Sequence, residues 1–270
     1  MQYFVGDVAH ILGITPSALR FYEDKKIIYT RKTQSGRRYY EHSDLARLLS
    51  FKKYSAMGIP IKAVVQQFAQ SGDSRHVIRE RVEEKISTAR EKAAYYEFLA
   101  GVIEGHAQQM RDIDRLNGQF EVFLRPALYL LNDPQDQLIS KQPEVRDIMR
   151  QWVQGAPATR YTFFHPEAAP TMDADSLLGY IVQASDAHIL RLPVDHPNVL
   201  TLPQSVCVRT IVEMDNSFDQ GMRPFATIER YIREKNLRMT GVPLASLIVV
   251  ESITNTHYRS FLDVTVPFAL

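Results

Sequence analysis

A proline-free segment from about Arg75 to Leu116 constrains the fold of this chain more than any other feature. Apolar residues recur in it at steps of three, four or seven, a pattern typical of a coiled-coil seam. A helix of this length would be about 60 Å long at 1.5 Å per residue and would extend beyond any small domain. We therefore expect the seam to pack against a second copy of the chain in a homodimer; the alternative is a helix that lies on its own domain. The seam residues are Ile78, Val82, Ile86, Ala89, Ala93, Tyr96, Leu99, Ile103, Met110 and Ile113.

The parts of the chain on either side of this helix differ in charge. Residues 1–70 carry eleven Lys or Arg against five Asp or Glu, a net charge of +6, whereas residues 119–270 carry a net charge of −4. A basic block favours a polyanionic partner, which would repel an acidic block. The charge distribution therefore indicates that only the N-terminal part approaches a nucleic acid.

The composition favours a soluble globular protein, with 45% apolar and 23% charged residues. No stretch approaches the roughly 18 apolar residues of a membrane span. The first residues, MQYFVGDVAHILG, lack both a basic leader and a long apolar run. We therefore expect a cytoplasmic protein without a membrane partner.

The sequence offers little for metal, cofactor or catalytic chemistry. The single cysteine, Cys207, excludes an internal disulfide and a metal site built on paired cysteines. The eight histidines are dispersed, and no close pair would place two ligands on one helix face. Neither a G-x-S-x-G motif nor a phosphate-binding glycine loop is present. We expect no metal, no cofactor and no catalytic residue.

Two short helices are predicted at the start of the chain. Apolar residues in Phe4–Ile14 follow helical spacing until Gly13 breaks the pattern. Thr15 and Pro16 then provide an N-cap hydroxyl and a proline at the first helical position of a second helix that runs to about Asp24. In this second helix we expect Leu19 and Phe21 to pack inward. Two helices joined by a glycine-centred turn are typical of a helix-turn-helix.

A basic hairpin and further helices are predicted next. The β-prone pieces Ile27–Tyr29 and Arg38–Tyr40 flank Gln34-Ser35-Gly36 and indicate a two-stranded wing, with basic residues near its tip that suit contact with a phosphate backbone. Ser43 and Asp44 are predicted to cap a third helix, which Gly58 ends, and a short fourth helix follows. The wing cations are Arg31, Lys32, Arg37 and Arg38, the third helix carries Leu45, Leu48, Leu49 and Phe51, and the fourth carries Val64, Val65 and Phe68.

The residues after Asn117-Gly118 predict a mixed domain with an antiparallel sheet. The fold class is thus α+β and multidomain: a winged helix-turn-helix over residues 1–74, a dimerisation helix over 75–118 and an α+β ligand-binding domain over 119–270. The expected strands are Phe120–Leu124, Leu128–Leu131, Tyr161–Phe164, Leu177–Val182, Val206–Glu213, Leu247–Ile253 and Leu262–Pro267, and the expected helices are Pro143–Trp152 and Pro224–Asn236.

The segments VGDVAHILGITPSALRFYEDKKII and SGRRYYEHSDLARLLSFKKYSAMGIPIKAV resemble the N-terminal module of MerR-type transcriptional regulators. The resemblance covers about residues 3–70, and the long helix that follows is similar to the antiparallel dimerisation helix of that family. It implies a regulator that binds double-stranded promoter DNA as a homodimer, together with RNA polymerase, and that activates by distorting the promoter. The DNA-contacting residues expected from helix and wing are Thr15, Ser17, Arg20, Tyr22, Arg37, Arg38 and Tyr39.

The C-terminal part, which ends HYRSFLDVTVPF, resembles the gyrase-inhibitor-like effector domain of the multidrug-sensing branch of that family. This resemblance implies an aromatic pocket that binds lipophilic cations beside an acidic side chain; the absence of that acid from its expected position leaves a neutral lipophilic ligand open as well. The acid of the family is expected near Leu244–Leu247, where this chain has none, and counting by two places Glu251 on the strand face opposite Ser246. The expected ligand-binding residues are Trp152, Tyr161, Phe163, Tyr180, Ser246, Ile248 and Tyr258.

Two other functions are compatible with the sequence. The C-terminal domain could be a small-molecule hydrolase fused to a DNA-binding module, with Glu251 or Glu213 acting beside Tyr258. Alternatively, the chain could bend DNA without sensing a ligand, in which case its pocket would be empty and uncharged.

Overall fold

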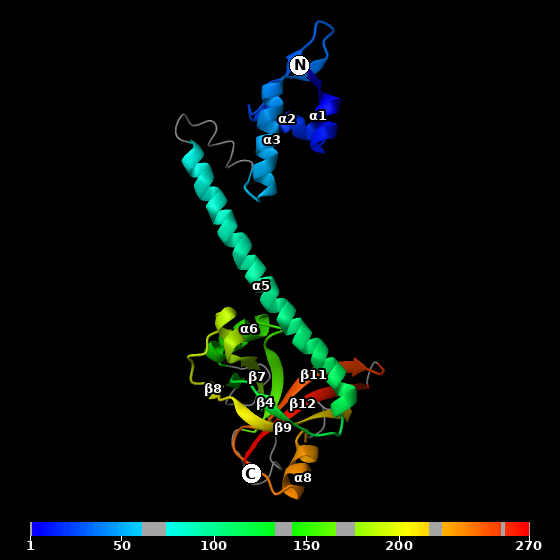
Figure 1. Ribbon diagram of the computed structural model, residues 1–270, viewed down its shortest axis with the longest axis vertical. Coiled ribbons are helices and arrows are strands. Elements are labelled where there is room, and N and C mark those ends of the chain that lie inside the picture. The colour runs from blue at the N-terminus through cyan, green and yellow to red at the C-terminus, as the bar shows by residue number, and fades with distance from the viewer. Residues whose placement is uncertain are drawn as a thin grey trace. The chain divides into compact units, whose positions relative to one another are not determined.

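The computed structural model describes residues 2–60, 74–132, 142–165, 176–215, 223–254 and 257–269. The chain forms two compact units, residues 1–96 and 97–270, and the boundary between them lies within helix α5 (Ser74–Leu116) (Figure 1). The first unit is mainly helical and the second is built on an antiparallel sheet, so the predicted α+β class is confirmed. The division into segments 1–74, 75–118 and 119–270 stays a prediction.

The first unit begins with the two predicted helices, α1 (Val5–Leu12) and α2 (Pro16–Asp24). Gly13 ends α1 in the left-handed conformation, with φ 59°, which a residue without a Cβ adopts at little cost. The Thr15 side chain then accepts a hydrogen bond of 3.2 Å from the Ala18 amide and caps α2. Both helices pack with α3 (His42–Ala56) around a core that includes Val8, Leu12, Leu19, Ile28, Tyr40, Leu48 and Phe51.

The wing differs from its prediction. Its strands are β1 (Tyr3–Phe4), β2 (Arg31–Lys32) and β3 (Arg38–Tyr40), paired antiparallel in the order β1-β3-β2. The strand predicted at Ile27–Tyr29 is wrong, because Ile27 and Ile28 are buried in the helical core rather than paired in the sheet.

Helix α3 was predicted to follow a cap at Ser43 and Asp44, but it begins before that cap. The helix starts at His42, and the buried Asp44 carboxylate lies in its first turn, where it accepts a hydrogen bond of 3.0 Å from the Glu41 amide. Ser43 therefore lies within the helix, and the cap of the helix is formed around Glu41 and Asp44. The predicted fourth helix, with Val64, Val65 and Phe68, falls outside the described residues.

Helix α5 is continuous through Gly101 and Gly105, as the spacing predicted. Three large seam residues, Ile86, Tyr96 and Ile103, expose 46%, 64% and 54% of their surface. These side chains therefore leave an apolar stripe uncovered within a single chain. Among the described residues, no helix combines the length and apolar character needed to cross a membrane.

The second unit contains a sheet of nine strands in its described residues, with the order β4-β9-β12-β11-β6-β7-β5-β8 and β10 paired to β12. Neighbouring strands pair antiparallel. The predicted strands and both predicted helices are present within a few residues, whereas α7, β8 and β10 were missed. The strands are β4 (Glu121–Arg125), β5 (Leu128–Asn132), β6 (Arg160–Phe164), β7 (Leu177–Gln183), β8 (Val199–Leu202), β9 (Ser205–Asp215), β10 (Arg238–Met239), β11 (Leu244–Ser252) and β12 (Tyr258–Ala269), and the helices are α6 (Pro143–Gln154), α7 (Ala184–Ile189) and α8 (Ala226–Glu234).

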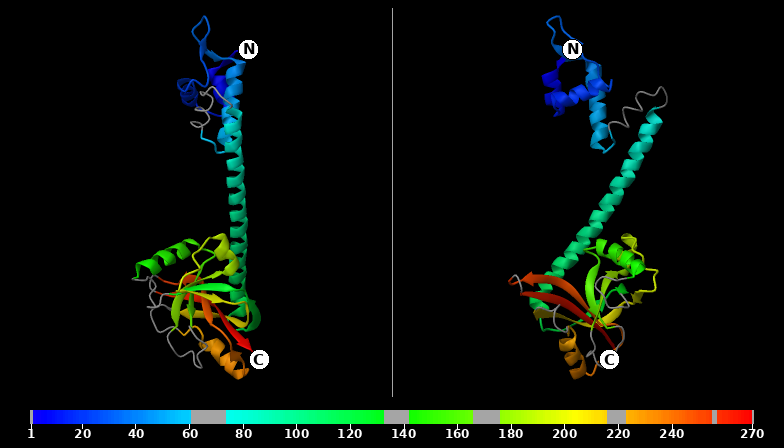
Figure 2. Two further views of the ribbon diagram at one scale, coloured as in Figure 1. Left: turned by 90° about the vertical axis from the view of Figure 1, so that its left-hand side faces the viewer. Right: turned by 180° about the vertical axis from the view of Figure 1, so that it is seen from behind.

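Side-chain alternation along the central strands gives the sheet two different faces. Val208 of β9 and Val264 of β12 pack against Ile228 of α8. The neighbouring Arg209 and Asp263 point to the other face, where they bond to side chains of α5. Helices α8 and α5 therefore cover opposite faces of the same strands (Figure 2).

We predict that Gly179→Ala destabilises the second unit. Gly179 lies in β7 between two strands, and a Cβ at this position would lie 2.7 Å from the Leu131 carbonyl oxygen. Overpacking of this kind costs about 1–3 kcal/mol of unfolding free energy. Denaturant unfolding of the two proteins measures the loss. Gly101→Ala is the control, because a Cβ there meets nothing within 4 Å, and an unchanged stability for Gly179→Ala would contradict the packing.

Candidate functional site

Helix α2 presents its polar side chains because Leu19 anchors it. Leu19 is fully buried, whereas Ser17 and Arg20 are exposed. Tyr22 is half-buried, and this burial raises the pKa of its phenol. The expectation that Phe21 packs inward is wrong: 45% of it is exposed, because one helical turn cannot direct both Leu19 and Phe21 to the core.

The basic side chains of the wing fall into two groups. Arg37 is exposed, and its guanidinium lies 4.3 Å from the centre of the Phe4 ring, which orients it. Arg31 is instead bound to Asp44 at 2.8 Å and to Glu41 at 3.2 Å. Arg31 therefore holds the wing to α3, while Arg37 is available to an anionic partner.

Glu23 connects helix α2 to the wing. Its carboxylate accepts a hydrogen bond of 2.6 Å from the Tyr40 hydroxyl, another from the Thr30 hydroxyl, and pairs with Arg38 at 3.5 Å. Burial and the nearby Glu23 raise the pKa of Tyr40 far above its usual value, so this phenol stays a donor. These contacts fix β3, with Arg38 and the half-buried Tyr39, relative to α2.

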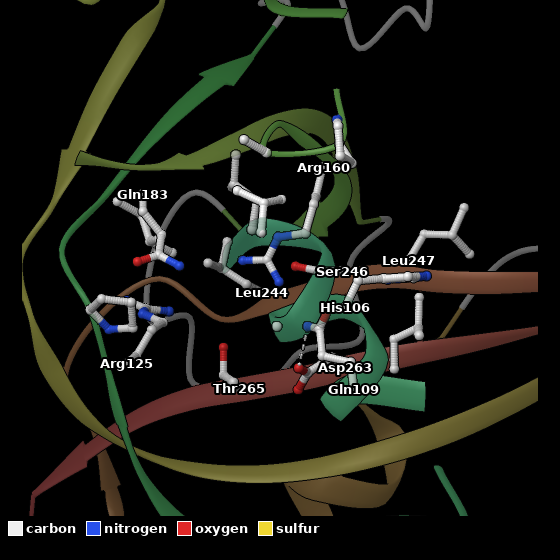
Figure 3. Close-up of a pocket in the computed structure, with 18 of the residues that line it drawn as sticks. His106, Gln109, Arg125, Arg160, Gln183, Leu244, Ser246, Leu247, Asp263 and Thr265 are labelled. Carbon is white, nitrogen blue, oxygen red and sulfur yellow. Dashed lines mark hydrogen bonds between the residues drawn. The ribbon is translucent and has the colours of Figure 1, made fainter. Parts of the chain in front are cut away.

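The second unit contains a cavity of about 520 Å³ between α5 and the sheet (Figure 3). Gly101 and Gly105, one helical turn apart, form part of its wall, and a Cβ at either position would meet nothing within 4 Å. The glycines thus leave space where larger residues would fill it. Other lining residues are His106, Gln109, Phe123, Arg125, Arg160, Tyr161, Gln183, Leu244, Ser246, Ile248, Asp263 and Thr265.

A buried ion network contributes Arg209, Asp112 and Asp263 to the lining of this cavity. The Arg209 guanidinium, with 8% of its side chain exposed, donates hydrogen bonds of 2.9 and 3.0 Å to Asp263, and of 3.0 Å to both Asp112 and Glu121. Burial opposes ionisation of Asp112, but hydrogen bonds from Arg115 and Gln108 and the charge of Arg209 lower its pKa. Arg115 likewise lowers the pKa of Glu121. The network therefore holds α5 on the sheet through charged groups.

The predicted ligand-binding residues separate into two sets. Tyr161, Ser246 and Ile248 line the cavity. Trp152 does not, because it is fully buried and its indole donates to the Pro193 carbonyl at 3.2 Å. Phe163 lies on the other face, in the core under α8. Tyr180 and Tyr258 are also not among the residues that line the cavity.

The predicted face of Glu251 is wrong because β11 contains a bulge. Leu247 pairs with Leu262 but Val249 pairs with Phe261, so one extra residue shifts the alternation. Glu251, opposite Arg259, therefore shares the face of Ser246, which lies opposite Asp263. Glu251 accepts a hydrogen bond of 2.7 Å from Arg259 and does not line the cavity; the cavity carboxylates are those of Asp112, Asp186 and Asp263, which sequence reasoning missed.

Residues 3–70 match the sequence profile of a family described as "MerR HTH family regulatory protein". This segment is similar to the helix-turn-helix module of MerR-family regulators. Its boundaries agree with the resemblance seen in the sequence, and the helix-turn-helix, wing and α3 of the structure lie within it. Which of its side chains contact DNA stays a prediction.

The chain is also similar to the HTH-type transcriptional regulator ZntR of Escherichia coli K12, to which it is 25% identical over 92 residues. That alignment covers 31% of this chain and spans 65% of the length of ZntR. Among solved structures, EcmrR in a complex with DNA covers 99% of both chains at 14% identity and a TM-score of 0.36. A hydrolase of Listeria innocua covers 60% of this chain and 97% of its own at 9% identity and a TM-score of 0.37. TM-scores this low do not establish a shared arrangement.

The described residues offer no cluster of three His, Cys, Asp or Glu side chains that could hold a metal ion. The ionisable side chains that gather in this chain are instead arginines and carboxylates around the cavity. They come from α5, β4, β6, α7, β9 and β12, which are far apart in the sequence. Only the pairing of strands brings them together, so no local motif could have identified them.

We predict that Arg209→Met destabilises the second unit by about 3–5 kcal/mol at neutral pH, because it leaves buried carboxylates without their partner. The pKa values of Asp112 and Glu121 are lowered in the folded state. These carboxylates therefore stabilise the wild type above about pH 4, and this contribution is lost as the pH falls through their folded pKa values. The difference in unfolding free energy between variant and wild type should shrink in acid. Denaturant unfolding at pH 7 and pH 3 tests this, with the exposed Arg233→Met as control; a difference that does not depend on pH would count against the network.

Proposed function

We propose that this chain is a DNA-binding transcriptional regulator that responds to a small molecule. The observation that carries the proposal is the family match of residues 3–70, in which Arg20 on α2 and Arg37 on the wing are exposed. A recognition helix with a free guanidinium suits the major groove, and a basic wing suits the adjacent phosphates. The proposed DNA contacts are those expected from the sequence: Thr15, Ser17, Arg20, Tyr22, Arg37, Arg38 and Tyr39.

The proposed partners are double-stranded promoter DNA, RNA polymerase and a second copy of the chain. The resemblance to MerR-type regulators supports activation by promoter distortion, whose energetic cost the backbone contacts would offset. The Arg38–Glu23 pair gives Arg38 a positioning role in addition to any phosphate contact, because it fixes the wing against α2.

We predict that Arg20→Ala weakens operator binding by about 1–3 kcal/mol and relaxes sequence preference, because a base contact is lost. Arg37→Ala should weaken binding to all sequences about equally and reduce the salt dependence by roughly one counterion. Fluorescence anisotropy on matched and scrambled operators at several salt concentrations measures both effects. Arg233→Ala, an exposed arginine of α8, is the control. Wild-type affinity in both module variants would refute the proposed contacts.

The uncovered stripe of α5 supports a homodimer. Tyr96 and Ile103 are large, apolar and exposed on one side of the helix. Burying such side chains against a second α5 would gain about 25 cal/mol for each Å² of apolar surface removed from water.

We predict that Tyr96→Asp or Ile103→Asp converts the protein to a monomer, because a charge in an apolar seam is not compensated. Light scattering measures the mass. Ser87→Asp is the matched control: it lies nine residues, about two and a half helical turns, from Tyr96 and therefore on the other side of α5. Dimers that persist in both seam variants would place the interface elsewhere.

The cavity of the second unit is the proposed effector site. Its volume of about 520 Å³ suits a drug-sized ligand, and apolar side chains such as Leu244 and Ile248 in its wall suit a lipophilic one. Among the described lining residues, the Phe, Tyr and Trp side chains are Phe123 and Tyr161. Most of the aromatic residues expected for a cation pocket lie elsewhere, so the proposal retains a lipophilic effector but draws no support for a cationic one.

The two alternative functions receive less support. Glu213 and Glu251 are both bound to Arg259, at 3.2 and 2.7 Å, and neither lines the cavity, so they are poorly placed as catalytic acids. A DNA bender with a vestigial sensor would have an uncharged pocket, whereas this cavity is lined by arginines and aspartates. Stoichiometric ligand binding without product formation would separate a regulator from a hydrolase.

A further inference from the structure

Among the described residues, no carboxylate contacts two arginines of the cavity wall, the buried Arg125 and the half-buried Arg160. Arg125 of β4 is only 3% exposed; its Nη1 donates to the Val242 carbonyl at 2.9 Å, and its Nε has no hydrogen-bond partner. Arg160 of β6 also lines the cavity. Within the described part of the chain, neither guanidinium lies within 4.0 Å of a carboxylate oxygen, in contrast to Arg209. Buried cations without a counter-charge are costly to maintain.

The titratable groups nearest these arginines do not neutralise them. Burial raises the pKa of Cys207, so the thiol beside Arg125 stays neutral at pH 7. The two carboxylate oxygens of Asp263 already accept hydrogen bonds from Arg209, and one of them also from Gln109 at 3.1 Å. Asp186 acts on Arg160 only at longer range. Burial lowers the pKa of both Arg125 and Arg160, as expected for cations short of a partner.

The surroundings of Arg160 fit an oxygen-rich group. Figure 3 shows its guanidinium directed into the cavity, with Ser246 beside it and Gln183 and Arg125 across the space. These side chains offer hydrogen-bond donors around one region of the cavity. The wall also includes apolar side chains, among them Leu128, Ile181, Leu244, Leu247 and Ile248.

We propose that the cavity binds an organic oxyanion, a carboxylate or phosphate monoester on an apolar body, with its charged end between Arg160 and Arg125. Guanidinium groups match the geometry of both oxyanions and form strong charge-assisted hydrogen bonds with them. A lipophilic cation would instead face two positive charges that have no carboxylate within 4.0 Å among the described residues. This inference deepens the proposed function, on which it rests for the cavity being the effector site.

The test uses four probes with a phenyl ring and a four-carbon chain but different ends: phenylbutyrate, phenylbutyl phosphate, the neutral phenylbutyramide and the cationic phenylbutylamine. Titration calorimetry on the full chain measures affinity, and thermal unfolding measures stabilisation by ligand. We expect the two anions to bind and the amide and amine to bind at least tenfold more weakly. Comparison of phenylbutyrate with phenylbutyl phosphate shows which oxyanion is preferred.

Three variants locate the binding. Arg160→Gln should weaken anion binding tenfold or more, and the ligand-free variant should be at least as stable as wild type, because it removes a half-buried charge that no described carboxylate contacts. An arginine with a purely structural role would give a less stable variant. Gly105→Leu should block all binding by filling the cavity without altering either arginine. Arg150→Gln, at an exposed arginine of α6, is the control and should bind as wild type does.

The inference is overturned if neither anion binds the wild type, if the amine or amide binds as tightly as the acid, or if Arg160→Gln binds the anions with unchanged affinity. Operator binding of the same preparation, measured without ligand, tests the proposed function separately. If the protein binds operator DNA but prefers the amine, the proposed function is supported and the oxyanion inference is refuted. If it binds the oxyanion but no DNA, the oxyanion inference is supported and the proposed function is refuted.

Discussion

The interaction of Arg209 with Asp263, Asp112 and Glu121 determines how the second unit is built. Its four side chains come from the neighbouring strands β9 and β12, the edge strand β4 and helix α5, so the network connects these elements. Charges taken out of water are stable only when their geometry satisfies most of their hydrogen bonds, and here the guanidinium meets three carboxylates. Because this contact holds the charged face of α5 on the sheet, the glycines of the preceding turns come to lie over the cavity. The same contact therefore fixes the helix and creates the space beside it.

Local sequence signals correctly predicted α1, α2 and α5, because neighbouring residues determine where these helices form. Thr15, Pro16 and Gly13 define the ends of α1 and α2 through hydrogen bonding and backbone conformation, and the spacing in residues 75–116 predicts α5. The prediction failed at Ile27–Tyr29, because a short apolar run has the same composition in a buried turn as in a strand. It also missed the two-residue strand β1, whose pairing with β3 depends on contacts nearly forty residues away.

The two candidate sites differ in how far the sequence could predict them. The proposed DNA contacts lie within 25 residues of one another and follow from a contiguous motif. The cavity residues are distributed from Gly101 to Thr265, and their faces depend on strand register. One extra residue in β11 moves Glu251 to the opposite face, which no count by two could reveal. Aromatic content suggested a cation pocket, but composition does not show that Trp152 and Phe163 are buried in separate cores.

A ligand can regulate only through a difference in its affinity for two states of the protein. Arg160 acts electrostatically on Asp263, and Asp263 bonds both Arg209 and Gln109, a residue of α5. An oxyanion at Arg160 would neutralise that charge and so change the field at the carboxylate to which α5 is bound. On this proposal the state of α5 responds to the ligand through charge rather than through shape. Because linkage is reciprocal, any arrangement of α5 that DNA binding favours would change the affinity for the oxyanion by the same factor.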